Sequence, residues 1–133
     1  MTVPSIDLRD ESFIVARPQD LAMYFARADV RRTWWPDLRL AVSEHRGDEG
    51  VRWIVGGALT GTAEIWLQAW RDGVVVHWFL RAEPPPGTGT RRTRRLARRY
   101  ALGYKARIHR LKDEAERGRP PGTPPCHARS PVA

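Results

Sequence analysis

Residues that could exchange protons or attack a substrate are few in this sequence, and their spacing brings no catalytic set together. The four histidines are expected in a turn, a strand, a helix and a C-terminal segment: His45, His77, His109 and His127. None has the spacing of a metal-ligand pair such as HxxxH. His77 is the one nearest the expected core, and a solvated or paired strand histidine is the commoner situation. The sequence therefore predicts no catalytic residue, no metal ligand and no cofactor.

Apolar and aromatic residues instead suggest a binding site for a small molecule. Such a site needs a concave apolar surface with a few polar groups. Eight residues could supply both, with the tyrosine hydroxyls as polar anchors: Trp53, Ile65, Leu67, Val76, Trp78, Leu80, Tyr100 and Tyr104. A core filled completely by these large side chains explains the same residues, so the sequence leaves the pocket and the filled core both open.

Six arginines form a second candidate site: Arg91, Arg92, Arg94, Arg95, Arg98 and Arg99. Positive charge at a helix N-terminus opposes the helix macrodipole, so helix stability does not explain the cluster. An anionic partner would explain it, and nucleic acid, an acidic protein surface and anionic lipid all qualify. No helix-turn-helix, RNP-like or zinc-finger pattern supports sequence-specific base reading. The other explanation is a solvated face set by codon bias, since 21 of the 23 basic residues are arginine, as in GC-rich bacterial genomes.

Composition limits the class of protein. With 133 residues, of which 41% are hydrophobic, the chain is most simply one domain with one core. Residues 1–84 hold 10 arginines and 12 acidic residues, a net charge of −2, whereas residues 85–133 hold 13 basic and 3 acidic residues, a net charge of +10. The sequence shows no apolar run of membrane-spanning length and no signal peptide, and Cys126 is its one cysteine. We expect a soluble, cytoplasmic protein.

Hydrophobic periodicity predicts a strand, two short helices and then a series of strands. The first strand is expected at 6–15, a helix begins at Pro18, and a second helix, 29–34, is capped by Asp29 and ended by Pro36. From there the period changes to two, which predicts strands at 38–42, 51–55, 62–70 and 74–82.

A long helix is expected at 91–117, because its apolar residues recur every three or four positions. Thr90 is its expected N-cap, and Gly118 and Pro120 are the expected stop. Residues 1–117 are thus predicted to form the domain, and the Pro-rich segment 118–133 is predicted to be a disordered tail.

Asp72-Gly73 predicts a two-residue hairpin turn, which sets a register between the last two strands. Paired positions then sum to 145, so Leu67 faces Trp78 on a wholly apolar side. The opposite side pairs Trp66 with Phe79, Gln68 with His77, and Glu64 with Arg81. We interpret the first side as inward and the second as outward or as an interface, with the Glu64–Arg81 pair a surface ion pair worth under about 1 kcal/mol.

The stretch from Phe13-Ile14-Val15-Ala16-Arg17-Pro18 through Ala28-Asp29 to Trp34-Trp35-Pro36 resembles the START-like (SRPBCC) superfamily, polyketide cyclase/dehydrase type. The resemblance extends by architecture to about residues 5–117. It implies an α+β helix-grip fold, in which a curved antiparallel sheet wraps around the long C-terminal helix, and it implies a lipid, polyketide or other aromatic ligand. Such domains usually have six strands after the two helices, whereas four are predicted here, so this chain is shortened by about two strands.

Three functions remain open from the sequence. The leading hypothesis is binding of a hydrophobic small molecule between sheet and helix, with no assigned chemistry. The alternatives are a non-enzymatic interaction module that docks an anionic partner on its basic helix, and a polyketide cyclase/dehydrase in which the pocket tyrosines and His77 are the only candidates.

A homodimer is also predicted from the last strand. No strand follows it, which would leave an unpaired edge, and its outward residues Val75 and Phe79 would lie next to Trp66 and Trp70. A second copy could pair with that edge or stack on that face. The competing explanation is that strand 6–15 covers the edge within one chain.

Overall fold

The computed structural model describes residues 3–117, so the predicted tail, the helix stop at Gly118, Cys126 and His127 lie outside the described residues. The elements follow in the order β1 (Ile6–Ile14), α1 (Pro18–Ala26), α2 (Ala28–Trp34), β2 (Leu38–His45), the short 3-10 helix η1 (Gly47–Glu49), β3 (Gly50–Gly57), β4 (Thr60–Trp70), β5 (Gly73–Glu83) and α3 (Thr90–Glu116). This is the predicted order of elements.

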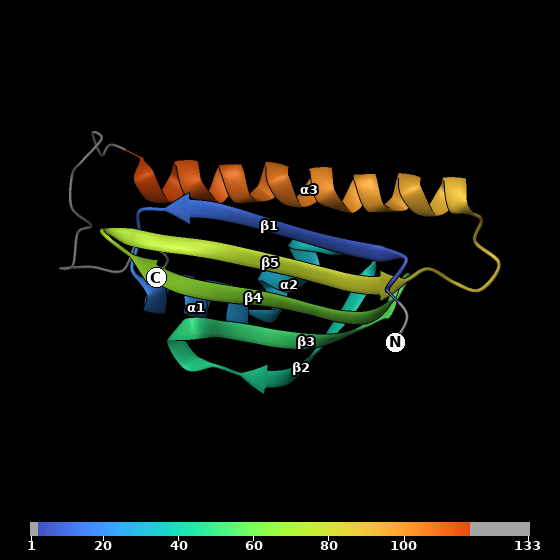
Figure 1. The fold of residues 1–133 in the computed structure, drawn as a ribbon. Helices are drawn as coiled ribbons and strands as arrows, with labels where there is room; N and C mark the ends of the chain where they lie inside the picture. The colour runs from blue at the N-terminus through green and yellow to red at the C-terminus, as the bar shows by residue number, and fades with distance from the viewer. Residues whose placement is uncertain (1–2, 118–133) are drawn as a thin grey trace.

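The five strands form one curved antiparallel sheet in the order β1-β5-β4-β3-β2 (Figure 1). All three α-helices lie against the same face, with α1 packed on β3 and β4, and α3 packed along β1. The other face, which is turned toward the viewer in Figure 1, carries no helix. This is the α+β helix-grip arrangement, with the four strands that the sequence predicts after the two short helices.

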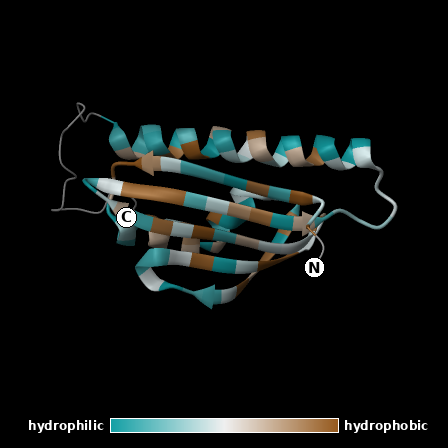
Figure 2. Cartoon of the chain, viewed as in Figure 1, coloured by the Kyte–Doolittle hydropathy of each residue, from teal (hydrophilic) through white to brown (hydrophobic). Residues whose placement is uncertain are grey.

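Alternation along the strands explains why one face is covered. In β3, Val51, Trp53 and Val55 are buried, whereas the intervening Arg52 and Ile54 are exposed. Apolar and polar residues alternate in the same way along the neighbouring strands (Figure 2). Because side chains on a strand point alternately to its two faces, this pattern places one apolar surface under the helices. None of the helices in residues 3–117 is both long and apolar enough to cross a membrane.

The predicted pairing of β4 with β5 is wrong by two residues. Trp70 pairs with Gly73 and Ile65 pairs with Trp78, so the turn residues are Arg71 and Asp72, with Arg71 at a φ of 51°. Gly73 is the first residue of β5, where a Cβ would come within 2.3 Å of the carbonyl oxygen of Ile14 in β1. Glycine is therefore used for the close approach of β1 and not for the turn. A shift of two residues preserves the face of every side chain.

The predicted ion pair between Glu64 and Arg81 is also wrong, because Glu64 lies opposite Phe79. Its carboxylate binds Arg46 at 2.5 Å and Arg52 at 3.3 Å instead. Arg81 lies 3.6 Å from the carboxylate of Asp7 in β1.

Two predicted helix caps are wrong as well. Asp29 lies in the first turn of α2, and its carboxylate binds the guanidinium of Arg27, the residue before the helix. That hydrogen bond lowers the pKa of Asp29 and occupies the oxygens that a capping residue would use. At α3 the N-cap is Gly89, and Thr90 is already helical.

The unpaired edge predicted at the last strand does not exist. β1 pairs with β5 over the whole length of β1, from Ile6 with Ala82 to Ile14 with Val74. β5 therefore lies between β1 and β4 in the sheet, with a strand on each side. The competing explanation, that the first strand covers this edge within one chain, is correct.

Candidate ligand site between the sheet and the long helix

The eight residues predicted to line a pocket come together in the interior. Each has at most 8% of its surface exposed: Trp53 from β3, Ile65 and Leu67 from β4, Val76, Trp78 and Leu80 from β5, and Tyr100 and Tyr104 from α3. The sheet residues occupy alternate positions of their strands, and the two tyrosines are four residues apart on one helix face. Periodicity alone thus brings them to one interface.

Aromatic rings fill much of this interface. Trp78 stacks on Tyr104 with ring centroids 4.1 Å apart and planes 7° apart. Trp35 lies nearly parallel to Tyr104 at 6.5 Å and contacts Trp53 at 5.7 Å. A continuous set of rings therefore joins β3 and β5 to α3 and to the end of α2.

Two further aromatic residues of this interior were not predicted as site residues from the sequence. Trp34 and Trp35, at the end of α2, are 6% and 5% exposed, and Trp34 lies 5.8 Å from Tyr104. The Trp-Trp-Pro segment that carries the family resemblance was the available signal. A pair of large apolar side chains ending a short helix has to pack somewhere, and here both pack beneath α3.

Four polar atoms in this interior make no hydrogen bond to any described residue. They are the indole Nε1 atoms of Trp53 and Trp78 and the hydroxyl oxygens of Tyr100 and Tyr104. A buried polar group without a partner costs about 1–3 kcal/mol of stability. All four belong to residues that the sequence predicted as site residues, so the interior combines apolar walls with donors that have no partner in the protein.

Burial also sets the ionisation of the two tyrosines. Removal from water raises the pKa of Tyr104 well above its ordinary value, and the nearby charge of Asp10 raises it further. Burial also raises the pKa of Tyr100, whose hydroxyl lies near the Arg99–Asp37 ion pair without a well-formed hydrogen bond. Both hydroxyls therefore stay protonated near neutral pH and act as hydrogen-bond donors rather than as bases.

A hollow of about 180 Å³ lies beside this interior between α2 and α3, and of the eight predicted residues only Tyr100 and Tyr104 line it. Its lining residues are Trp34, Trp35, Pro36, Arg99, Tyr100, Gly103, Tyr104 and Arg107. At the rim of this hollow, two cationic side chains of α3 reach across to residues in and after α2. Arg99 binds the carboxylate of Asp37 at 3.0 Å, and Arg107 donates to the carbonyl oxygen of Thr33 at 3.2 Å.

His77 lies on the other face of the sheet, as predicted, but it is only 7% exposed. Its ring stacks on Trp66 with centroids 4.2 Å apart, and its Nε2 is 3.0 Å from the amide oxygen of Gln68. Because the sheet separates His77 from Tyr100 and Tyr104, the histidine and the tyrosines cannot exchange protons directly.

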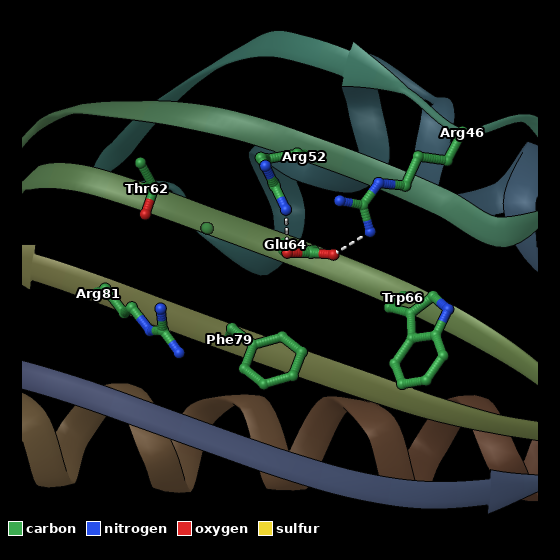
Figure 3. A pocket seen from close by; sticks show the side chains of 8 residues that line it. Arg46, Arg52, Thr62, Glu64, Trp66, Phe79 and Arg81 are labelled. Carbon is green, nitrogen blue, oxygen red and sulfur yellow. Dashed lines mark hydrogen bonds and ion pairs between the residues drawn. The ribbon is translucent and has the colours of Figure 1, made fainter.

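The uncovered face has a larger and more polar hollow of about 490 Å³ around Glu64 (Figure 3). It is lined by Arg46, Arg52, Thr62, Ala63, Glu64, Trp66, Phe79 and Arg81. An adjoining hollow of about 400 Å³ shares Trp66 and Phe79 and extends to β1. We name this uncovered face of the sheet, with its two hollows, the outer face.

The arginine cluster is separate from both sites. Arg91, Arg92, Arg94, Arg95, Arg98 and Arg99 are all exposed on α3. Only Arg99 contributes to the rim of the interior hollow. Within residues 3–117, no three His, Cys, Asp or Glu side chains are grouped as metal ligands.

No model of a protein family and no curated protein sequence matches this chain. Solved structures do resemble it. A protein of Deinococcus radiodurans is 14% identical over 84% of this chain and 98% of its own, with a TM-score of 0.63. The Aha1 dimer from Colwellia psychrerythraea is 15% identical, covering 86% and 99% of the two chains, with a TM-score of 0.59.

A third similar structure is the di-domain ARO/CYC StfQ from the steffimycin biosynthetic pathway. It is 18% identical to this chain over 80% of this chain and 49% of its own, with a TM-score of 0.57. At these identities the likeness establishes the fold. The chain has the helix-grip fold.

Proposed function

We propose that this protein binds a hydrophobic small molecule between the sheet and α3, without performing chemistry on it. The observation that carries the proposal is the set of four unpartnered polar atoms in an otherwise apolar interior. A core selected for stability alone gains by replacing such groups with apolar ones. Their presence on the inward faces of β3, β5 and α3 is explained if a ligand accepts hydrogen bonds from them.

The chemistry of these atoms defines the ligand class. Indole nitrogens only donate hydrogen bonds, and the tyrosine hydroxyls are held protonated, so the ligand needs acceptor oxygens. The stacked rings of Trp78 and Tyr104 favour a planar partner. We therefore favour an aromatic or polyketide ligand with carbonyl or hydroxyl oxygens over a simple acyl chain, and the likeness to an ARO/CYC protein supports this choice.

The volume of the hollow limits how the ligand enters. At about 180 Å³ it is smaller than the roughly 300 Å³ at which small-molecule pockets begin. A ligand with two or more fused rings thus requires the Tyr104 ring to move from its place on Trp78. The filled core and the pocket are then two states of one interior, and the ligand selects the open state.

The site does not support a cyclase. The hollow is lined by arginine and tyrosine but by no histidine or carboxylate, and His77 lies across the sheet. Acid-base catalysis needs a group that can accept a proton near neutral pH. Tyrosines with raised pKa values do not meet that requirement.

The proposal is tested by thermal unfolding in the presence of 1-naphthol, anthraquinone and palmitate. A ligand that binds only the folded state raises the melting temperature. We expect a rise with an oxygen-bearing aromatic compound, its loss in Trp78→Phe, which removes an indole donor, and its retention in Trp66→Phe, the matched change on the outer face. A panel without any rise, or a rise that survives Trp78→Phe unchanged, would contradict the proposal.

We also propose that the outer face joins two copies of the chain. Trp66, Phe79 and Val75 are half-buried there and Trp70 is 52% exposed, which is a large apolar surface for a monomer. The same face pairs cations with anions, as in Arg46 and Arg52 with Glu64 and Arg81 with Asp7. A two-fold interface sets a surface against itself, and a charge-balanced surface can do so without repulsion. The similar Aha1 protein from Colwellia psychrerythraea is a dimer, which is consistent with this.

Sedimentation at micromolar concentration tests the dimer. We expect a dimer for the wild type and a monomer for the double variant Trp66→Glu, Phe79→Glu. Met23→Glu, an apolar residue that is 62% exposed on α1, is the matched control and should remain dimeric. A monomeric wild type would refute the proposal.

A further inference from the structure

The first ten residues of α3 differ from the rest of the helix. None of residues 90–99 is buried, and the first buried side chain of α3 is that of Tyr100. In Figure 1 this end of α3 extends past the ends of β1 and β5. At 1.5 Å per residue the segment is about 15 Å long. It is thus a short helical arm, which we call the arginine arm, residues 90–99.

Six of these ten residues are arginines on one side of the helix. At about 100° per residue, Arg91, Arg92, Arg94, Arg95, Arg98 and Arg99 cover an arc of about 160°. The buried residues of α3, Tyr100, Tyr104, Ile108 and Leu111, lie on the opposite side. The arc therefore faces away from the domain, and packing against the domain cannot account for it.

The charge of the arm is largely uncompensated. Among residues 3–117, Arg99 alone of the six has a carboxylate within 4.0 Å, that of Asp37. Further along the same helix Lys105 binds Asp10 at 2.7 Å and Lys112 binds Glu116 at 2.8 Å. The arm also has no acidic residue in its first turn, where one would offset the positive end of the macrodipole. A polyanion would supply the missing charge.

The shape of the arc discriminates between polyanions. A bilayer surface is flat and meets one side of a helix, and an amphipathic helix that lies in it also inserts apolar side chains. Within residues 90–99 the charged arc holds only arginines, because Thr90 and Thr93 lie on the opposite side of the helix and Leu96 is half-buried against the core. The nearest exposed apolar side chain on the charged side is that of Leu102, beyond the arm. Arginines spread over about 160° instead suit a groove whose two walls both carry phosphates.

We propose that the arginine arm lies in the major groove of double-stranded DNA and binds its phosphates without reading base sequence. The major groove, about 12 Å wide, admits an α-helix, whereas the major groove of duplex RNA is too narrow. The arm has no aromatic side chain on which bases of a single strand could stack. Because the contacts are with phosphates, affinity depends on charge and salt and little on sequence.

The test is fluorescence anisotropy of the full-length protein with a labelled 20-base-pair DNA duplex of mixed sequence, at 50–200 mM salt. If all six arginines neutralise phosphates, the slope of log affinity against log salt is about −5, and affinity falls about a thousandfold across this range. Replacing Arg91, Arg92, Arg94 and Arg95 with Gln removes four contacts. The slope then falls to about −2, with at least a tenfold loss of affinity at 50 mM salt.

A second variant has the same net charge as this fourfold variant but leaves the arginine arm unchanged. Arg32, Arg39, Arg71 and Arg110 to Gln removes four arginines elsewhere, and its slope should stay near that of the wild type. Equal losses in both variants would show attraction by net charge alone and would overturn the proposal. It would also be overturned by tighter binding to single-stranded DNA, to duplex RNA of the same length, or to vesicles of phosphatidylserine and phosphatidylcholine. Circular dichroism of both variants checks that α3 remains helical.

Discussion

Replacing Tyr104 with phenylalanine tests the buried polar atoms directly. Tyr104 is 2% exposed, its ring stacks on Trp78, and its hydroxyl has no hydrogen-bond partner among the described residues. Phenylalanine keeps the ring and the stack and removes only the hydroxyl. An unsatisfied buried hydroxyl costs about 1–3 kcal/mol, so we expect Tyr104→Phe to raise the free energy of unfolding by about 1 kcal/mol or more.

The assay is urea unfolding followed by tryptophan fluorescence, with thermal unfolding alongside. A gain of about 1 kcal/mol corresponds to a rise of roughly 3–6 °C in melting temperature for a domain of this size. Tyr24→Phe is the matched control, because the Tyr24 hydroxyl accepts a hydrogen bond from the indole of Trp34 at 3.1 Å. Tyr24→Phe removes this hydrogen bond and should therefore lower the free energy of unfolding. If Tyr104→Phe lowers stability as much as Tyr24→Phe does, the Tyr104 hydroxyl is satisfied and our reasoning about the interior is refuted.

Two further predictions concern the same interior. Trp78→Ala should lower the free energy of unfolding by on the order of 3–5 kcal/mol, because Trp78 is 1% exposed. Trp70 is 52% exposed, so Trp70→Ala should change the free energy of unfolding by less than about 1 kcal/mol. Similar losses for the two variants in urea unfolding would contradict the burial of Trp78. Because burial raises the pKa of Tyr104 in the folded state, the unfolded state releases this proton first as pH rises. Stability should therefore fall above about pH 10, and less steeply in Tyr104→Phe; identical pH profiles for the two proteins would be the contrary result.

The strands and the faces of their side chains follow from the sequence because a period of two is a local property. Leu67 and Trp78 point toward the helices and Trp66 and Phe79 point away, as predicted, even though the predicted pairing was off by two residues. The pairing itself depended on Gly73, whose role is set by the carbonyl of Ile14 in β1. That contact joins residues nearly sixty positions apart, and no local pattern reports it.

The candidate site shows the same division. The burial of the eight predicted residues follows from the sequence because each sits on an apolar face, but the sequence could not show that Trp35 would join Tyr104 and Trp53. Nor could it show which polar atoms lack partners, since that depends on what every neighbouring side chain presents. The Asp29 cap failed for a related reason, because Arg27 competes for its carboxylate.

The most direct test of a ligand in the interior is the ¹H–¹⁵N NMR spectrum of the tryptophan indoles. Each of the six indole N–H groups gives one signal, which a Trp→Phe variant assigns. On addition of the aromatic compound that most raises the melting temperature, we predict that the signals of Trp53 and Trp78 move as their N–H groups gain an acceptor. The signals of Trp66 and Trp70 on the outer face should stay in place. Movement confined to Trp66 and Trp70, with Trp53 and Trp78 unchanged, would contradict a ligand site between the sheet and α3.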